Sequence, residues 1–216
     1  MAAARAWLIR HGESESNAGL PGRGPAETPL TRLGFRQSEL VARAVPEPPA
    51  LIVTSPFVRA RQTAHPTIAR FPDSAVQEWP VQEFTYLGHL HGEVSTDRQR
   101  APYARAYWQR ADPHAVTGDA ESFADLIGRT ADCLGRLERQ TDGLVTVFTH
   151  GTFIRALLWS LLSRTTIMTG EAMSRFRAFA DTCVMPNGSI VELRFPGPRV
   201  LAGSTAHLLE ATAETR

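Results

Sequence analysis

The sequence has little of several features that would mark a specialised class of protein. Its only cysteines, Cys133 and Cys183, lie far apart and are best explained as buried, reduced thiols of a cytoplasmic protein. A formal net charge of +1 gives no push toward nucleic acid or an anionic membrane. No apolar run approaches the roughly 20 residues of a membrane-spanning helix. The apolar stretch near the start is too short for a signal peptide.

Length and composition indicate one compact domain over residues 1–216. Hydrophobic residues make up 43% of the chain and charged residues 21%, which is ordinary for a globular protein. A chain of this length is long for one small domain and short for two. Residues 87–118 have weak periodicity, two prolines and many arginines, so we expect an excursion over the sheet there. The sequence leaves the oligomeric state open.

Short apolar runs alternate with longer helical patterns, which predicts an α/β fold. Runs of strand length occupy 6–9, 51–54, 76–79, 144–149 and 190–195. Helical patterns occupy 31–44, with Thr31 as the cap, 59–69, 121–139 and 152–162. Three of the strand runs are almost wholly apolar, as expected of strands covered on both faces, whereas 190–195 alternates like an edge strand. We therefore predict a three-layer α/β/α sandwich with a mainly parallel sheet.

Reactive and cationic residues stand where the predicted strands end. The run 6–9 leads into Arg10 and His11, the run 51–54 leads toward Arg59, and the run 144–149 leads into His150. The carboxyl ends of parallel strands meet at one rim, so these four side chains should lie together. Two arginines and two histidines form a pocket for a dianion, because the guanidinium fork matches phosphate oxygens. Helix starts expected after Gly12 and at Thr152 would add backbone N–H donors.

A neutral imidazole in such a pocket can act as a nucleophile toward phosphorus. Transfer in two steps at one histidine removes the need for a metal, and we expect neither a metal nor a cofactor. His89 and His91 are close in sequence, but no cysteine or carboxylate cluster accompanies them, so we interpret them as loop histidines. The arginines of the excursion, Arg100 among them, are best explained as a solvated face, with contact to an anionic substrate as the alternative.

Five segments, in order, resemble the histidine phosphatase (phosphoglycerate mutase-like) superfamily. They are Leu8-Ile9-Arg10-His11-Gly12-Glu13-Ser14 with Asn17, Thr28-Pro29-Leu30-Thr31-Arg32-Leu33-Gly34, Ser55-Pro56-Phe57-Val58-Arg59-Ala60-Arg61-Gln62-Thr63-Ala64, Val81-Gln82-Glu83-Phe84 with Gly88, and Thr149-His150-Gly151-Thr152-Phe153-Ile154-Arg155. Together they span roughly residues 5 to 195. The resemblance implies a phosphoglycerate mutase-like fold, with the 87–118 excursion over the active site.

The resemblance also implies a role for each matching residue. His11 is the nucleophile that becomes phosphorylated, and Arg10, Arg59 and His150 hold the phosphoryl oxygens. Glu83 donates a proton to the leaving oxygen and later takes one from water, a role that suits a carboxyl with a raised pKa. Glu78 is the alternative acid, because the segment around Glu83 matches less tightly. Substrate contacts fall to Asn17, Arg23, Gly151 and Thr152, although the loop after Arg23 lacks the aspartate that family members often carry.

Three functions remain open at this point. The favoured one is a phosphomonoesterase that acts on a small phosphorylated substrate without a metal. A second is a cofactor-dependent phosphoglycerate mutase, although such enzymes usually carry a longer insertion than the 66 residues between Glu83 and His150. A third is a non-catalytic, phosphoryl-binding regulatory protein, which would need no nucleophile paired with an acid.

Overall fold

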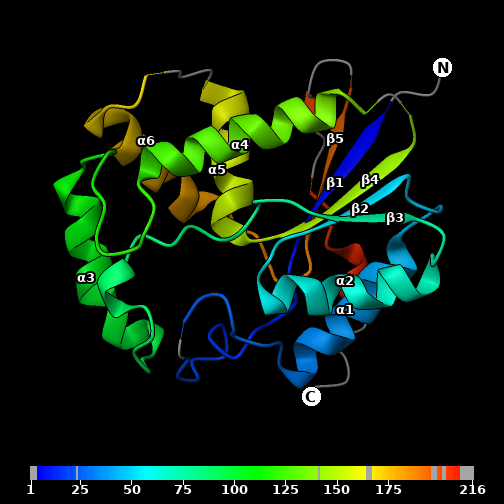
Figure 1. Ribbon diagram of the computed structural model, residues 1–216, viewed down its shortest axis with the longest axis horizontal. Coiled ribbons are helices and arrows are strands. Elements are labelled where there is room, and N and C mark those ends of the chain that lie inside the picture. The colour runs from blue at the N-terminus through cyan, green and yellow to red at the C-terminus, as the bar shows by residue number, and fades with distance from the viewer. Residues whose placement is uncertain are drawn as a thin grey trace.

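A six-stranded sheet in the order β3-β2-β4-β1-β5-β6 forms the middle of the fold (Figure 1). The computed structural model describes residues 4–22, 24–140, 142–163, 167–195, 199–200 and 203–209. The strands are β1 (Arg5–Arg10), β2 (Leu51–Thr54), β3 (Ala75–Glu78), β4 (Leu144–Thr149), β5 (Ile190–Arg194) and β6 (Arg199–Val200). The first four pair in parallel, whereas β5 is antiparallel to β1 and β6 is antiparallel to β5. The predicted mainly parallel sheet is confirmed.

Six helices connect and cover the strands. They are α1 (Arg32–Ala44), α2 (Val58–Arg70), α3 (Asp97–Arg110), α4 (Phe123–Glu138), α5 (Gly151–Ser163) and α6 (Gly170–Thr182), with short 3-10 turns at Gly88–Leu90 and Ala206–Leu208. Thr31 caps α1 as predicted, because its hydroxyl accepts a hydrogen bond from the Gly34 N–H at 3.1 Å. Within the described ranges, every helix is too short or too polar to cross a membrane.

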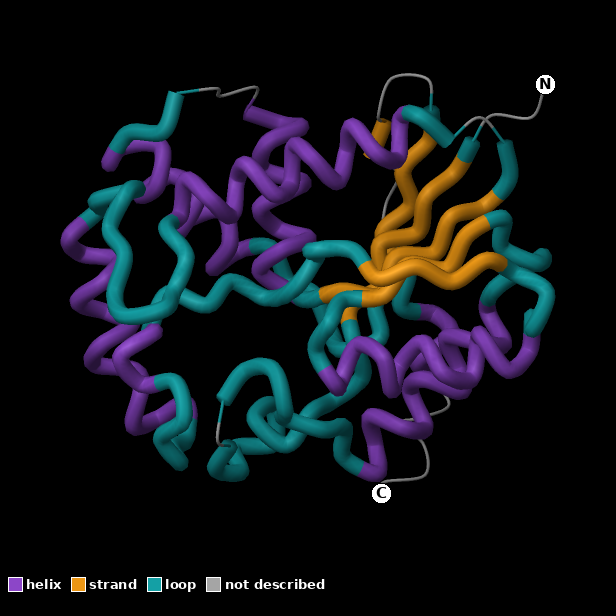
Figure 2. Tube along the Cα trace, in the orientation of Figure 1, coloured by secondary structure: helices purple, strands orange, loops and turns teal. Residues whose placement is uncertain are grey.

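The sheet lies between two helical layers, so the predicted three-layer sandwich is confirmed (Figure 2). Successive strand residues point to opposite faces. Leu8 and Val147 therefore join the larger core under α4 and α5, while Ile9 and Phe148 join the smaller core under α1 and α2. All four side chains are fully buried, which explains why the strand runs are almost continuously apolar.

The prediction of an edge strand over 190–195 is wrong. β6 pairs with β5 and takes the edge position, so β5 lies between β1 and β6. The charged residues that suggested an edge, Glu192 and Arg194, lie two residues apart on the same face of β5. Arg194 Nε donates to a Glu192 carboxylate oxygen at 2.8 Å. The charges therefore reflect a local ion pair and not a free sheet edge.

Two helices lie where the sequence patterns indicated none. α3 lies inside the 87–118 excursion and buries only Tyr107, so it has no apolar stripe to reveal it. Its start is nonetheless marked by a capping box, in which Thr96 and Gln99 exchange hydrogen bonds. α6 begins after its cap Thr169 and buries three residues on one side. It packs against α5 and α3, at the left of Figure 1.

Candidate active site

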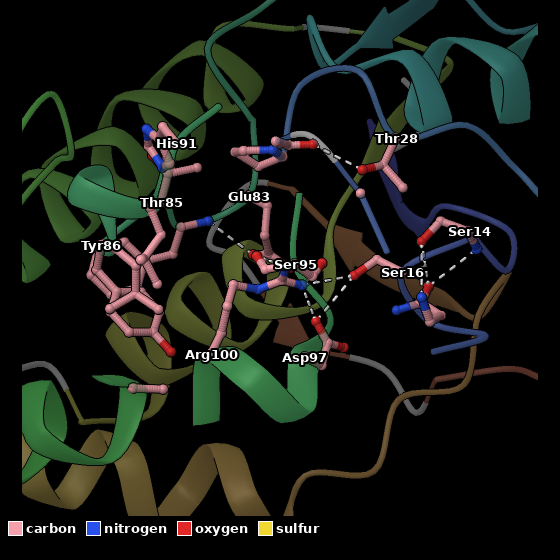
Figure 3. A pocket seen from close by; sticks show the side chains of 18 of the residues that line it. Ser14, Ser16, Thr28, Glu83, Thr85, Tyr86, His91, Ser95, Asp97 and Arg100 are labelled. Atoms are coloured by element: carbon pink, nitrogen blue, oxygen red, sulfur yellow. Dashed lines mark hydrogen bonds and ion pairs between the residues drawn. The ribbon is translucent and has the colours of Figure 1, made fainter. Parts of the chain in front are cut away.

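The carboxyl ends of β1, β2 and β4 meet beside a cavity of about 480 Å³. Five of the predicted site residues line it, namely Arg10, His11, Asn17, Arg59 and Glu83. We call Arg10, His11 and Arg59 the inner end of this cavity. The rest of its lining, which we call the outer wall, comes mainly from residues 14–28 and 84–104, several of which are labelled in Figure 3. Residues far apart in the chain therefore converge as the parallel topology predicts.

His11 is held as a neutral imidazole in one tautomer. Its Nδ1 lies 2.6 Å from the Gly12 carbonyl oxygen, which can only accept, so Nδ1 carries the proton. Arg59 Nε donates to Nε2 at 3.1 Å, which agrees with an unprotonated Nε2. The side chain is 3% exposed. Burial first, then the charges of Arg59 and Arg10, hold the pKa of His11 well below its ordinary value of 6.5.

Neither arginine of the inner end forms an ion pair with a carboxylate of the described residues; Arg59 is buried and Arg10 is partly buried. Arg59 donates from a terminal nitrogen to the Pro25 carbonyl, and burial lowers its pKa to about 10. Arg10 donates to the Met185 carbonyl, and burial lowers its pKa as well. Its Nε is buried and has no hydrogen-bond partner within the described part of the chain. Neighbouring groups therefore offset the positive charge of the inner end only in part, which favours the binding of an anion.

His150 lies directly behind His11, with 5.1 Å between the ring centroids, and it is fully buried. Its Nε2 is 2.8 Å from the Ser55 hydroxyl, while its Nδ1 has no partner among the described residues. Burial lowers the pKa of His150 well below 6.5, and the charge of Arg59 adds to this effect. Ser55, at the end of β2, was not singled out from the sequence and sets the orientation of this ring.

Glu83 is the carboxylate that faces the inner end. It accepts hydrogen bonds from the backbone N–H groups of Phe84 at 3.0 Å, Thr152 at 3.1 Å and Phe153 at 3.3 Å. The last two donors belong to the first turn of α5, so the carboxylate lies at the positive end of that helix. Glu78, the alternative acid, is exposed at the end of β3, 3.6 Å from Arg61, and does not line the cavity.

The other predicted substrate contacts are Thr152, Gly151 and Arg23. Thr152 gives its N–H to Glu83, and its side chain lines a second cavity of about 280 Å³ behind Tyr86. Gly151 is buried between two guanidinium groups, because a Cβ there would lie 3.3 Å from Arg10 Nε and 2.8 Å from a terminal nitrogen of Arg155. Arg23 lies outside the described residues.

The prediction of a helix start after Gly12 is wrong. Residues 14–19 form turns, closed by hydrogen bonds from Ala18 N to Ser14 O and from Gly19 N to Ser16 O, both at 3.0 Å. Asn17 caps this turn, since its Oδ1 accepts from the Ser14 backbone at 3.3 Å. Tertiary contacts from other parts of the chain, described next, hold this loop in place without a helix.

Asn187 is a site residue that the sequence did not reveal. Its Nδ2 donates to the backbone oxygens of His11 at 3.1 Å and Gly12 at 3.3 Å, and to Asn17 Oδ1 at 2.8 Å. The Gly188 N–H also donates to the His11 carbonyl, at 3.1 Å. The loop before β5 therefore holds the backbone on both sides of His11. A Pro-Asn-Gly sequence is typical of a turn, which is why it carried no functional signal.

Close backbone contact fixes the other side of the His11 loop. A Cβ on Gly34 would lie 2.1 Å from the Glu13 carbonyl oxygen, and one on Gly12 would lie 2.4 Å from the Gly34 carbonyl oxygen. Neither contact leaves room for a side chain. The Gly12 N–H also donates to the Thr63 hydroxyl on α2 at 3.0 Å. The glycines at both motifs are thus required for the loop to seat on α1.

Comparison with known proteins agrees with this geometry. Residues 6–197 match the model of the histidine phosphatase superfamily, branch 1. The chain is 28% identical over 156 residues to a metal-independent phosphoserine phosphatase of Arabidopsis thaliana, covering 69% of this chain and 65% of that one. It is 31% identical over 168 residues to a glucosyl-3-phosphoglycerate phosphatase of Mycolicibacterium vanbaalenii, covering 73% and 74%.

A solved structure shows the same fold with a related sequence. The mycobacterial glucosyl-3-phosphoglycerate phosphatase, solved in complex with VO3, superposes with a TM-score of 0.70 at 26% identity, covering 92% of this chain and 97% of that one. The family match covers every motif on which the resemblance depended. The chain therefore belongs to branch 1 of the histidine phosphatase superfamily, as its sequence predicted.

Proposed function

We propose that this phosphatase hydrolyses small phosphate monoesters in two steps, through a phosphohistidine on His11. The observation that carries this is the unprotonated Nε2 of a buried, neutral His11 between Arg10 and Arg59. A lone pair held at the bottom of a cationic pocket is placed to attack a phosphoryl group and is protected from protonation.

In the first step the phosphoryl group moves from the ester oxygen to His11. The ester P–O bond breaks and a bond forms between phosphorus and Nε2, after Arg59 Nε shifts from Nε2 to a phosphoryl oxygen. Glu83 in its protonated form gives a proton to the departing alcohol oxygen. Arg10 and Arg59 offset the charge that gathers on the phosphoryl oxygens, which is the main catalytic requirement of phosphoryl transfer.

In the second step water takes the phosphoryl group from His11. The P–N bond breaks as the water oxygen bonds to phosphorus, and the Glu83 carboxylate accepts the water's proton. Inorganic phosphate leaves, and both residues return to their starting states. No metal is needed in either step, because the arginines supply the positive charge.

Buried nitrogens that lack partners in the described part of the chain support an anion at the inner end: the Arg10 Nε–H is a donor, and His150 Nδ1–H is one when the Ser55 hydroxyl donates to Nε2. Within the described residues, Arg10 Nε and His150 Nδ1 are buried without hydrogen-bond partners. A buried polar group left unpaired costs about 1–3 kcal/mol, which a phosphoryl oxygen within reach would recover. The mycobacterial relative was solved in complex with VO3, so a protein of this fold binds an oxyanion.

Hydrolysis of p-nitrophenyl phosphate, followed by an alkaline quench that preserves phosphohistidine, tests this function. We expect turnover unaffected by chelator, inhibition by vanadate, and a phosphoryl group on His11 in peptide mapping. His11→Ala should abolish both label and turnover, whereas His65→Ala, which alters an exposed histidine on α2, should abolish neither. Label on another residue, or turnover only with added metal, would contradict the two-step scheme.

The same labelled enzyme separates the two alternatives. A mutase would pass the phosphoryl group from His11 to a phosphoglycerate faster than to water. A purely regulatory protein would bind vanadate but form no phosphohistidine. A probable phosphoglycerate mutase of Photorhabdus laumondii matches over 59 residues, or 27% of this chain, whereas the two phosphatases match over 69% and 73%, which favours hydrolysis.

A further inference from the structure

The outer wall decides which alcohol part of the substrate fits, since the inner end binds only the phosphoryl group. Two arginines stand in this wall, Arg100 on α3 and Arg177 on α6. A substrate with a second anionic group, such as a carboxylate, would need one of them with free donors. The partners of both arginines therefore bear directly on the substrate class.

Both terminal nitrogens of Arg100 are engaged by neighbouring residues (Figure 3). One terminal nitrogen donates to the Ser95 carbonyl at 2.7 Å and the Ser95 hydroxyl at 3.0 Å. The other donates to the Ser16 hydroxyl at 3.2 Å and to the Asp97 carboxylate. Ser16 in turn donates to Asp97 at 3.1 Å. The guanidinium charge is thus neutralised by Asp97, and four acceptors already use its donors.

Arg177 is neutralised in the same way. Its Nε donates to one oxygen of Asp181 at 3.0 Å, and a terminal nitrogen lies 2.8 Å from the other oxygen. The guanidinium carbon also lies over the Trp108 ring, 5.3 Å from the ring centroid. A bidentate carboxylate and an aromatic face leave it little capacity for a second anion.

The other polar groups of the outer wall are hydroxyls, a carboxylate, the Asn17 amide and the His91 ring, whose Nδ1 lies 2.7 Å from the Asp119 carboxylate. Ser14, Ser95, Thr28 and Thr85 bring hydroxyls to it, and Glu93 brings a carboxylate that has no ion-pair partner among the described residues. Carboxylates and hydroxyls accept hydrogen bonds from hydroxyl groups, whereas a carboxylate repels a second anion. Tyr86 adds an aromatic face next to Phe84, with 4.8 Å between the ring centroids.

We infer that the substrate is the phosphate ester of an uncharged, hydroxyl-bearing alcohol, and that Asp97 enforces this choice by neutralising Arg100. The inference rests on the phosphomonoesterase function proposed above and specifies its substrate class. The inner end takes the phosphoryl dianion. In the outer wall each arginine is paired with an aspartate, so the residues described for it include no unpaired arginine. The wall offers hydrogen bonds to hydroxyl groups instead.

Two matched pairs of phosphate esters test this preference. In both pairs, glycerol 3-phosphate with 3-phosphoglycerate and glucitol 6-phosphate with 6-phosphogluconate, the second ester carries a carboxylate where the first carries a hydroxymethyl group. We expect the uncharged member of each pair to have at least a roughly fivefold higher kcat/KM, the effect of one partly exposed charge. Equal or reversed preference in either pair would overturn the inference.

Asp97→Asn tests the assigned residue. Removing this charge leaves Arg100 as an unpaired cation, so the ratio of kcat/KM for 3-phosphoglycerate over glycerol 3-phosphate should rise roughly fivefold to tenfold. Asp112→Asn is the matched control, because Asp112 pairs with Arg110 at the other end of α3 and lines neither cavity. An unchanged ratio in a folded Asp97→Asn protein that still turns over p-nitrophenyl phosphate would contradict the role of Asp97.

The remaining outcomes separate this inference from the function on which it rests. Loss of p-nitrophenyl phosphate turnover in the wild type would refute the proposed function itself. Turnover of p-nitrophenyl phosphate but of none of the four esters would refute only the substrate class. A preference for 3-phosphoglycerate that disappears in Arg23→Ala would also overturn it, and would assign the carboxylate to Arg23.

Discussion

The inner end and the outer wall of the cavity are built in opposite ways. His11, Arg59 and His150 stand at element ends packed into the core, and none is more than 6% exposed. The outer wall depends on α3, which buries one side chain, and on pairs such as the partly buried Arg100 with the exposed Asp97. Buried groups are costly to alter, whereas exposed polar pairs change at little cost in stability. The chemistry is thus fixed by the fold, while selectivity is free to vary.

The largest expected effect is at the inner end. His11→Ala should lower kcat/KM for p-nitrophenyl phosphate by about 10⁴-fold or more, because the nucleophile is lost. The protein should still fold, because its two cores are formed by apolar side chains on both faces of the sheet. Steady-state kinetics and thermal unfolding measure both. Activity within tenfold of the wild type would remove the contrast between the two ends.

Glu83→Gln should follow, with an effect that depends on the leaving group. An alkyl phosphate needs a proton as its alkoxide departs, so its rate should fall roughly 10²–10⁴-fold, with a much smaller loss for p-nitrophenyl phosphate. The phosphohistidine should also persist longer, because no carboxylate accepts the water's proton. Glu78→Gln is the matched control and should leave both rates unchanged. Equal losses on both substrates would reduce Glu83 to a cap of α5.

The two buried histidines should make stability depend on pH. Their pKa values are lowered in the folded state, so the unfolded chain binds protons that the folded chain does not. The stability of the folded state is thus greatest above about pH 6.5 and falls as the pH drops below that value, by up to about 2.7 kcal/mol per pH unit for two protons. Urea unfolding between pH 5 and 7 measures the slope.

A matched variant assigns that slope. His11→Gln should reduce it by about one proton, whereas the exposed His65→Gln should leave it nearly unchanged. An equal slope in wild type and His11→Gln would show that His11 is not held neutral in the folded protein. A phosphate-bound enzyme should show a smaller slope, because an anion at the inner end favours the protonated rings.

Gly34→Ala should destabilise the protein by about 1–3 kcal/mol, since the new Cβ clashes with the Glu13 backbone. The clash also displaces the loop that carries His11, so kcat should fall while the outer wall keeps its selectivity between esters. Gly128→Ala on α4 is the control, because its Cβ meets nothing within 4 Å and alanine favours a helix. A fully stable Gly34→Ala protein would contradict the close packing of α1 on the loop.

The smallest expected effect belongs to Asn187, a positioning residue. Asn187→Ala removes donors to the His11 and Gly12 carbonyls, and we expect kcat to fall roughly tenfold with little change in KM. Asn187→Asp keeps the shape but not the N–H donors, and should lose as much. Full activity in the aspartate variant would show that shape, and not donation, holds the loop.

The strands and most of the helices could be predicted because each carries its own apolar pattern. Leu8, Ile9 and Val147 are buried on both faces of the sheet, and such runs are visible in any single sequence. α3 escaped prediction because many of its side chains are polar and Tyr107 is its single buried one, so no apolar stripe runs along it. β6 escaped because a two-residue strand has no pattern of its own.

The candidate site also has residues that could be predicted from the sequence and residues that could not. Arg10, His11, Arg59, Glu83 and His150 follow from short motifs, and the structure brings all five together around the inner end. The partners of these side chains do not follow from motifs, because they depend on where distant loops meet. Ser55, Asn187 and the Arg100–Asp97 pair belong to this second group, and only the fold reveals them.

The hydrogen bonds from Asn187 to the His11 loop join residues 176 positions apart in the chain. A fragment that stops before residue 183 would contain all five sequence motifs, and yet it would lack the loop that accepts from Arg10 and donates to the His11 carbonyl. During synthesis on the ribosome the motifs therefore emerge long before the site can form. The nucleophile is thus synthesised early, whereas the site can form only after Met185 and Gly188 have been added.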